Sequence, residues 1–346
     1  MNSLPQFLPW HADTARMWLA QRERFAHAWL VHGLPGIGKR AFAQAAAASL
    51  LCEQPEQGLA CGRCAACRWV AGGNHPDLRR IRPDAVAHEE GDLGDEDAGA
   101  AKKTPSRDIR VEQLRELSNW FNTATHRGGW RVAVIYPARA MNLVTANALL
   151  KVLEEPPEHT VFLLVADAPD RLLPTLVSRC RRLPLPVPGR EASLAWLAAQ
   201  DIPDADLWLA AAGGAPLLAR DLARKGGTPC PDWLGGLITT LARDGTADIG
   251  QWADQLEKEP AEAWIDALQR VFVDLSLQAS GAPLRYFPAL SKPLGRLGER
   301  ASRKHIAQTA QWLCQQRAVA SHPLNSRLLV HTALQRVVLA CAAVSP

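Results

Sequence analysis

Four cysteines lie close together in the chain, with the spacing C-x8-C-x2-C-x2-C. They are Cys52, Cys61, Cys64 and Cys67. Four thiolates can surround a tetrahedral zinc ion, and the two-residue gaps allow backbone turns to direct neighbouring sulfurs at one point. The spacing predicts a structural zinc site, because four thiolates leave no coordination position open for catalysis. An iron–sulfur cluster and metal-free thiols or disulfides remain alternatives, although the Cys-Pro that continues a ferredoxin-type run is missing.

The remaining cysteines are scattered, and we expect them to be small buried apolar residues. They are Cys180, Cys230, Cys314 and Cys341. His75, in the sequence NHPDL, carries an imidazole, which is a common metal ligand. We expect His75 instead to form a turn beside the proline that follows it.

A glycine-rich loop follows a short apolar segment. Its sequence, GLPGIGK, matches the pattern GxxxxGK. In this pattern the glycines let backbone amides surround phosphate oxygens at a helix N-terminus, and the lysine neutralises the phosphate charge. The candidate phosphate-binding residues are Gly33, Gly36, Gly38 and Lys39.

The loop lacks the groups that hold magnesium. The next position is Arg40, where a serine or threonine hydroxyl would bind the metal, and an arginine repels a cation. Tyr136 and Pro137 follow the second apolar segment, where a working NTPase carries acidic residues for metal and water. The sequence therefore argues against binding of ATP with magnesium, and we expect no independent ATPase activity.

These residues lie among alternating strand and helix patterns. Residues 28–32, 131–136 and 160–166 read as strands, and residues 142–155 form a strong helix pattern that ends at two prolines. Helical spacing also follows Lys39 and recurs at residues 111–121. This alternation predicts an α/β domain with a parallel sheet and helices on both faces.

Strand patterns vanish beyond about residue 183, and helical ones continue at residues 191–200, 204–224, 233–243, 248–280 and 302–344. Proline- and glycine-rich hinges at 184–189 and 226–233 predict three domains, residues 1–182, 183–228 and 229–346. On the last helix, Leu334, Val337, Val338 and Cys341 share one face. That face indicates either core packing or a subunit interface.

The composition is that of an ordinary globular protein. Of 346 residues, 47% are hydrophobic and 21% are charged, which excludes wholesale disorder and fibrous repeats. Apolar runs are too short to cross a bilayer, and the N-terminus lacks a secretory pattern, so we expect a cytoplasmic protein. The net charge of +4 alone does not indicate nucleic-acid binding. An acidic insert, residues 84–106, lacks apolar periodicity and is expected to be a solvated loop.

Six motifs in the first half occur in this order in the bacterial clamp-loader AAA+ family: GLPGIGK, the four-cysteine module at 52–67, NHPDL, IRVEQLREL, NALLKVLEEPP and the triplet Ser178-Arg179-Cys180. The chain resembles that family over residues 8–182. In lacking these magnesium ligands, the chain is similar to the delta prime subunits of DNA polymerase III, rather than to the ATP-hydrolysing gamma or tau subunits. The resemblance implies a RecA-like AAA+ domain, a small helical lid and a helical collar used for oligomerisation.

The resemblance also implies a role for the triplet. Arg179 would be an arginine finger that enters the ATP site of a neighbouring gamma or tau subunit, while Ser178 and Cys180 shape the loop. The chain would be a stator in a heteropentamer with gamma or tau and delta, which loads the sliding clamp on primer-template DNA. It would thereby be part of a DNA-directed DNA polymerase holoenzyme, a nucleotidyltransferase.

The chain departs from active members of the family at two further positions. Ala166 or Asp167 stands where a threonine would sense the γ-phosphate, and Gly213-Gly214-Ala215-Pro216 replaces a lid segment that carries an arginine. Lys39 is retained, which leaves weak metal-independent binding of nucleotide or phosphate open. Two other functions also stay open, namely an ATP-hydrolysing motor subunit and a DNA-binding module that uses the zinc insert and a basic face.

Overall fold

The computed structural model describes residues 3–91, 104–121, 125, 129–319 and 326–342. The chain forms two compact units, Met1–Ala192 and Ser193–Pro346. The domain boundaries predicted at residues 182 and 228 stay a prediction.

The first unit is built on a five-stranded parallel sheet with the order β2-β3-β4-β1-β5. The strands are β1 (Ala28–His32), β2 (Leu78–Ile81), β3 (Arg131–Ile135), β4 (Thr160–Ala166) and β5 (Arg181–Pro184). The three predicted strands are β1, β3 and β4, the central ones, whose side chains are almost all buried. The edge strands β2 and β5 were missed because each carries two arginines and has only one buried residue.

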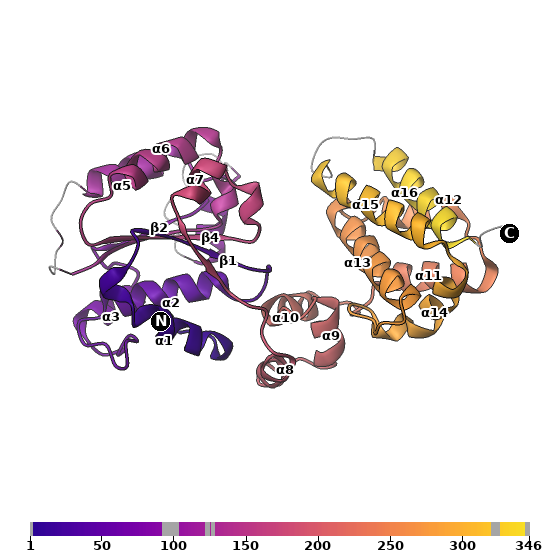
Figure 1. Ribbon diagram of the computed structural model, residues 1–346, viewed down its shortest axis with the longest axis horizontal. Helices are drawn as coiled ribbons and strands as arrows, with labels where there is room; N and C mark the ends of the chain where they lie inside the picture. Colours follow the sequence, from indigo (N-terminus) through magenta and orange to yellow (C-terminus); the bar gives the residue numbers. More distant parts are fainter. Residues whose placement is uncertain (1–2, 92–103, 122–124, 126–128, 320–325, 343–346) are drawn as a thin grey trace. The chain divides into compact units, whose positions relative to one another are not determined.

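Helices cover both faces of the sheet, as predicted (Figure 1). On one face lie α1 (Ala12–Leu19), α2 (Lys39–Leu51) and α3 (Ala65–Ala71), and on the other α5 (Val111–Phe121), α6 (Leu143–Glu154) and α7 (Pro174–Ser178). Short 3-10 helices are η1 (Pro9–His11), η2 (Arg22–Arg24), η4 (Ala138–Ala140) and η5 (Pro169–Arg171). Asn142 caps α6 by accepting a hydrogen bond from the backbone N–H of Thr145.

The acidic insert begins with a helix, α4 (Asp84–Glu89), so the predicted solvated loop is wrong there. Ala87 is buried, and Asp84 in the first turn forms an ion pair with Arg110 at 3.2 Å. A carboxylate in that position also interacts favourably with the helix dipole. Residues 92–103 of the insert lie outside the described residues.

The second unit is helical, as predicted, and contains two hydrophobic clusters. The first cluster joins α8 (Arg190–Ala198), α9 (Ala205–Ala211) and α10 (Pro216–Arg224). The second joins α11 (Asp232–Asp244), α12 (Ile249–Leu256), α13 (Ala261–Ala279), η6 (Pro288–Leu290), α14 (Ser291–Arg300), α15 (Arg303–Val319) and α16 (Ser326–Cys341). Among the described helices, none is both long and apolar enough to cross a membrane.

Two of the ranges predicted to be helical each contain two helices. Residues 204–224 form α9 and α10, which are separated at Gly213 and Gly214, both with left-handed backbone angles. Residues 248–280 form α12 and α13, which are separated before Pro260, the N-cap of α13. A proline cannot continue a helix, because it lacks the N–H and its ring clashes with the preceding turn.

The apolar face of α16 packs in the core of the second unit. Leu334, Val337 and Cys341 are buried there, and the partly buried Val338 lies against them. The structure thus confirms the core-packing interpretation of this face.

Candidate functional site

The glycine-rich loop connects β1 to α2, the arrangement expected of a phosphate loop. If Gly33 carried a Cβ atom, that atom would lie 2.5 Å from the carbonyl oxygen of Leu185. A Cβ atom at Gly38 would lie 2.2 Å from Cδ1 of Leu8. Gly36 and Gly38 also have φ values of 77° and 97°, in the left-handed region that favours glycine. The Leu185 carbonyl therefore requires glycine at position 33, and the backbone angles favour glycine at positions 36 and 38.

Lys39 is turned into the protein and is only 4% exposed. Its Nζ donates to the carbonyl oxygen of Leu34 at 2.5 Å and forms an ion pair with Oδ1 of Asp167 at 2.7 Å. Asp167 directly follows β4, which pairs with β1 through His32 and Ala166 at its end. The sheet thus brings the carboxylate beside the loop, and the lysine charge is neutralised by this chain itself.

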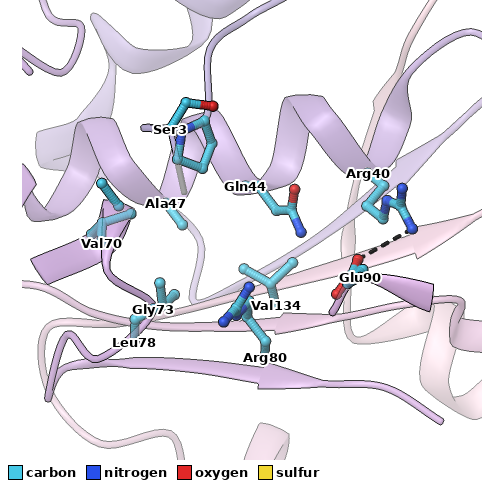
Figure 2. Close-up of a pocket in the computed structure, with 12 residues that line it drawn as sticks. Ser3, Arg40, Gln44, Ala47, Val70, Gly73, Leu78, Arg80, Glu90 and Val134 are labelled. Carbon is cyan, nitrogen blue, oxygen red and sulfur yellow. Dashed lines mark ion pairs between the residues drawn. The ribbon is translucent and has the colours of Figure 1, made fainter. Parts of the chain in front are cut away.

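Arg40 and Tyr136, the residues that replace the metal ligands, are joined through Glu90. Arg40 forms an ion pair with Glu90 at 3.1 Å, and Figure 2 shows both side chains at the edge of a cleft of about 270 Å³. Tyr136 donates its hydroxyl to Glu90 at 2.8 Å and accepts from Gln44 at 3.1 Å. Arg82 also contacts the Glu90 carboxylate at 2.9 Å. Burial raises the pKa of Tyr136, which keeps its hydroxyl a neutral donor.

Glu90 was not singled out in the sequence, because it lies in the acidic insert that was expected to be solvated. Its side chain is only 14% exposed. A carboxylate neutralised by two guanidiniums and a hydroxyl is a poor metal ligand, since a cation would have to displace those partners. This arrangement agrees with the weak metal positioning expected from Arg40 and Tyr136.

The N-terminal segment packs against the loop. Trp10 donates its indole N–H to the carbonyl oxygen of Ile37 at 3.0 Å. His11 is completely buried, and its ring lies 5.5 Å from that of Phe42 in an edge-to-face arrangement. Burial, and secondarily the charge of Lys39, lowers the pKa of His11 to about 4. The imidazole is therefore neutral at pH 7.

The four cysteine sulfurs converge on one point. All lie within 4.8 Å of one another, and Sγ of Cys52 and Sγ of Cys64 are 3.9 Å apart. Zinc–sulfur bonds of about 2.3 Å place the sulfurs of a tetrahedral site about 3.8 Å apart. Cys52 follows α2 and Cys64 caps α3, so the helix ends set the geometry. These residues can hold a metal ion such as zinc.

Backbone amides prepare the cluster for a cation. The N–H of Cys61 donates to Sγ of Cys52 at 3.3 Å, and that of Cys67 to Sγ of Cys64 at 3.4 Å. The backbone N–H groups of Arg63 and Cys64 lower the pKa of Cys61 to about 6, whereas burial raises the pKa of Cys52 and that of Cys67. Hydrogen bonds to a thiolate favour the charged form, which is the form that binds metal.

The other cysteines and His75 are not among the four residues whose ligand atoms converge. Cys180 and Cys341 are buried and Cys230 is half-buried, but Cys314 is exposed, so the prediction of burial is wrong for Cys314. It lies on α15, where cysteine occupies a solvent-facing helical position. His75 is buried, and its Nδ1 accepts the backbone N–H of Asp77 at 3.1 Å. This contact agrees with the predicted turn.

Arg179 follows the last residue of α7, and its side chain is 35% exposed. The guanidinium donates to the carbonyl oxygen of Thr175 at 3.1 Å and to the Glu154 carboxylate at the end of α6 at 2.5 Å. Ser178 donates to the same Thr175 carbonyl at 2.9 Å, and Cys180 is buried. The neighbours of Arg179 therefore shape the turn, while the guanidinium lies at the surface.

Comparison with known proteins gives close relatives. A family model described as DNA polymerase III, delta subunit, matches residues 16–188. The DNA polymerase III delta prime subunit of Pseudomonas aeruginosa is 34% identical over 338 residues, which are 91% of this chain and 92% of that protein. The delta prime subunit of Escherichia coli is 35% identical over 191 residues, 55% of this chain and 52% of that protein.

A tau subunit and a solved structure are also similar. The DNA polymerase III tau subunit of Escherichia coli is 35% identical, but over 45% of this chain and 21% of its own length. A gamma subunit-related protein of DNA polymerase III from Thermotoga maritima has 18% identity and a TM-score of 0.43, over 94% of this chain and 98% of that one. Since the family model and a relative that is matched over nearly its whole length agree, this chain belongs to the DNA polymerase III delta subunit family, among the delta prime subunits of the clamp loader.

Proposed function

We propose that this chain is the non-hydrolysing stator of the clamp loader and that it supplies Arg179 to the ATP site of a neighbouring gamma or tau subunit. The observation that carries the proposal is a contrast within the first unit. Carboxylates of the chain neutralise both Lys39 and Arg40 of the phosphate loop. Arg179 is also paired with a carboxylate, that of Glu154, but both side chains of this pair are partly exposed, at 35% and 51%, whereas Lys39 and Glu90 in the loop pairs are only 4% and 14% exposed.

The charges around the loop support the proposed lack of hydrolysis. Magnesium positions the β- and γ-phosphates and needs oxygen ligands. Arg40 stands where one of these ligands would be, and its partner Glu90 is also paired with Arg82. Tyr136 offers a neutral hydroxyl in place of a carboxylate. A metal ion bound here would face a guanidinium and have few free oxygens.

Arg179 fits the role of an arginine finger energetically. A surface ion pair contributes about 0 to 1 kcal/mol, so leaving Glu154 costs little. A guanidinium that offsets charge on the γ-phosphate increases the rate of phosphoryl transfer by roughly 10³ to 10⁵ in other systems. The gain in the transition state is therefore much larger than the cost of breaking the pair with Glu154.

The partners follow from this division of roles. A chain that lends an arginine needs a neighbour that binds ATP, and the gamma and tau subunits fit that need. The delta subunit completes the proposed heteropentamer, and primer-template DNA lies within the assembly. Subunits with distinct functions require distinct interfaces, so the chain need not form oligomers with itself.

The metal in the four-cysteine cluster is proposed to be zinc with a structural role. Cys52, Cys61, Cys64 and Cys67 supply four thiolates, the ligand set of closed structural zinc sites. Zinc in such a site stabilises the fold of its segment, here the connection between α2 and α3. It would carry no step of ATP hydrolysis.

Reconstitution tests the proposed function. The purified chain is incubated with ATP and magnesium, alone and together with gamma or tau, delta, the sliding clamp and primed DNA, and phosphate release is measured. We expect no turnover by the isolated chain, and faster turnover by the mixture than by the same mixture without it. Turnover by the isolated chain at the rate of the complete mixture would contradict the stator role.

A further inference from the structure

The Lys39 ammonium, which would bind phosphate in an active loop, is already occupied by a carboxylate. Its Nζ lies 2.7 Å from Oδ1 of Asp167, a charge-assisted contact at hydrogen-bond distance. Lys39 is 4% exposed, whereas the Asp167 side chain is 41% exposed. The aspartate is therefore the solvent-exposed partner of a buried ammonium.

The strand order fixes this contact. Ala166, the last residue of β4, is in register with His32, the last residue of β1. The loop begins at the next residue of one strand, and Asp167 is the next residue of the other. Because parallel strands end at the same edge of the sheet, the carboxylate lies beside the first residues of the loop. Its position follows from the sheet itself.

A second cation, Arg182, lies near the start of the loop, while the Glu90 carboxylate on the other side is already paired with Arg40 and Arg82. The pKa of His32 is lowered by burial, then by the charges of Arg182 and Lys39, so both cations act on the end of β1. The loop amides also lie at the N-terminus of α2, a helix of 13 residues, where the helix dipole favours anions. An anion is thus favoured here, and Asp167 supplies one from within the chain.

We propose that Asp167 determines the ligand specificity of the phosphate loop, because its carboxylate takes the anion position on Lys39 and excludes polyphosphates, including the phosphates of nucleotides. An entering phosphate would have to displace the carboxylate or lie against it, and two anions in contact repel strongly where water is partly excluded. The inference goes beyond the proposed function, since it concerns the loop of this chain and not the ATP site of a neighbour.

The test measures polyphosphate binding by the isolated full-length chain. Sodium tripolyphosphate and ADP, both without magnesium, are titrated calorimetrically into the wild-type protein and into Asp167→Asn, which keeps the shape and removes the charge. We expect Asp167→Asn to bind tripolyphosphate at least about tenfold more tightly, and Lys39→Met in that background to abolish the gain. Asp170→Asn, which removes an exposed carboxylate three residues further on, should bind as the wild type does.

A second measurement separates loss of fold from loss of binding. Asp167→Asn removes the ion-pair partner of a buried ammonium, so its melting temperature without ligand should fall, and tripolyphosphate should raise it more than in the wild type. The inference is overturned if Asp167→Asn melts cooperatively but binds no more tightly than the wild type, or if the gain survives without Lys39. Neither result depends on Arg179 or on ATP hydrolysis by the complex. Failure of this inference would therefore not contradict the proposed stator role.

Discussion

Arg40 and Glu90 form an ion pair at 3.1 Å across the edge of the cleft beside the phosphate loop. The pair joins the first turn of α2 to the residue that follows α4, within the acidic insert. It explains how an arginine is accommodated where a metal-binding hydroxyl would stand. The same carboxylate accepts the Tyr136 hydroxyl, so a single side chain stabilises both departures from a working ATPase.

Glu90 is expected to be important for stability. Its side chain is 14% exposed and contacts Arg40, Arg82 and Tyr136. Breaking one side of such a network leaves charges without compensation, so Glu90→Ala should lower the free energy of unfolding by about 2 to 4 kcal/mol. The control is Glu89→Ala, where the neighbouring side chain is exposed. Urea unfolding of the two variants checks this, and equal losses would refute the role given to Glu90.

Asp274 should stabilise the second unit. The carboxylate is completely buried in α13 and accepts backbone N–H bonds from Arg285, Tyr286 and Phe287, at 2.7, 3.0 and 2.7 Å. Asp274→Ala leaves these donors unsatisfied, and we expect it to cost about 3 kcal/mol or more. Asp254→Ala, at an exposed position on α12, should cost less than about 0.5 kcal/mol. Chemical unfolding that shows no difference between the two variants would contradict this assignment.

The free energy of unfolding should decrease as the pH falls below about 6.5, because of His11. Its pKa is lowered from 6.5 to about 4 in the folded chain, so between these values the unfolded chain binds a proton that the folded chain does not. Above pH 6.5 the titration of His11 does not reduce the free energy of unfolding. As the pH falls from 6.5 to 4, this titration lowers the free energy of unfolding by about 3 kcal/mol.

His11→Asn tests this by making the side chain neutral at every pH. The free energy of unfolding of this variant should depend less on pH between 6.5 and 4, whereas His305→Asn, at an exposed position on α15, should follow the wild type. Parallel curves for the wild type and His11→Asn would show that His11 is not the titrating group.

The cysteine cluster should contain about one zinc ion per chain in freshly purified protein. Cys64→Ser removes one of four converging thiolates, so we expect loss of zinc and a lower melting temperature. Cys314→Ser, which replaces an exposed cysteine outside the cluster, should retain the metal. Metal analysis of both variants decides this. A zinc content near zero in the wild type, or the brown absorbance of an iron–sulfur cluster, would disprove the assignment.

The structural elements that could be predicted are those whose pattern lies within a short stretch of sequence. The central strands are recognisable because both faces of each are buried, and the cysteines because their spacing is short. The edge strands β2 and β5 are not, since their arginines face solvent or make polar contacts. The helix α14 was missed as well, because Pro293, Gly295 and Gly298 interrupt its helical pattern.

The pairs that neutralise the loop could not be predicted. Lys39 and Asp167 come from segments far apart in the chain, and their contact depends on β4 lying beside β1. Glu90 belongs to a stretch whose composition indicates a solvated loop, yet it is drawn inward by Arg40, Arg82 and Tyr136. Composition indicates the average environment of a segment, and the environment of a single residue such as Glu90 can differ from that average.

The most direct test of the account is ATP hydrolysis by the reconstituted clamp loader with Arg179→Ala. We expect turnover on primed DNA with the sliding clamp to fall about 100-fold or more at the ATP site that Arg179 is proposed to enter, measured by single-turnover kinetics, while assembly is unchanged. Arg171→Ala, which removes an exposed arginine on η5, should leave the rate as it was. Undiminished turnover by an assembled complex that carries Arg179→Ala would show that this chain supplies no arginine to its neighbour.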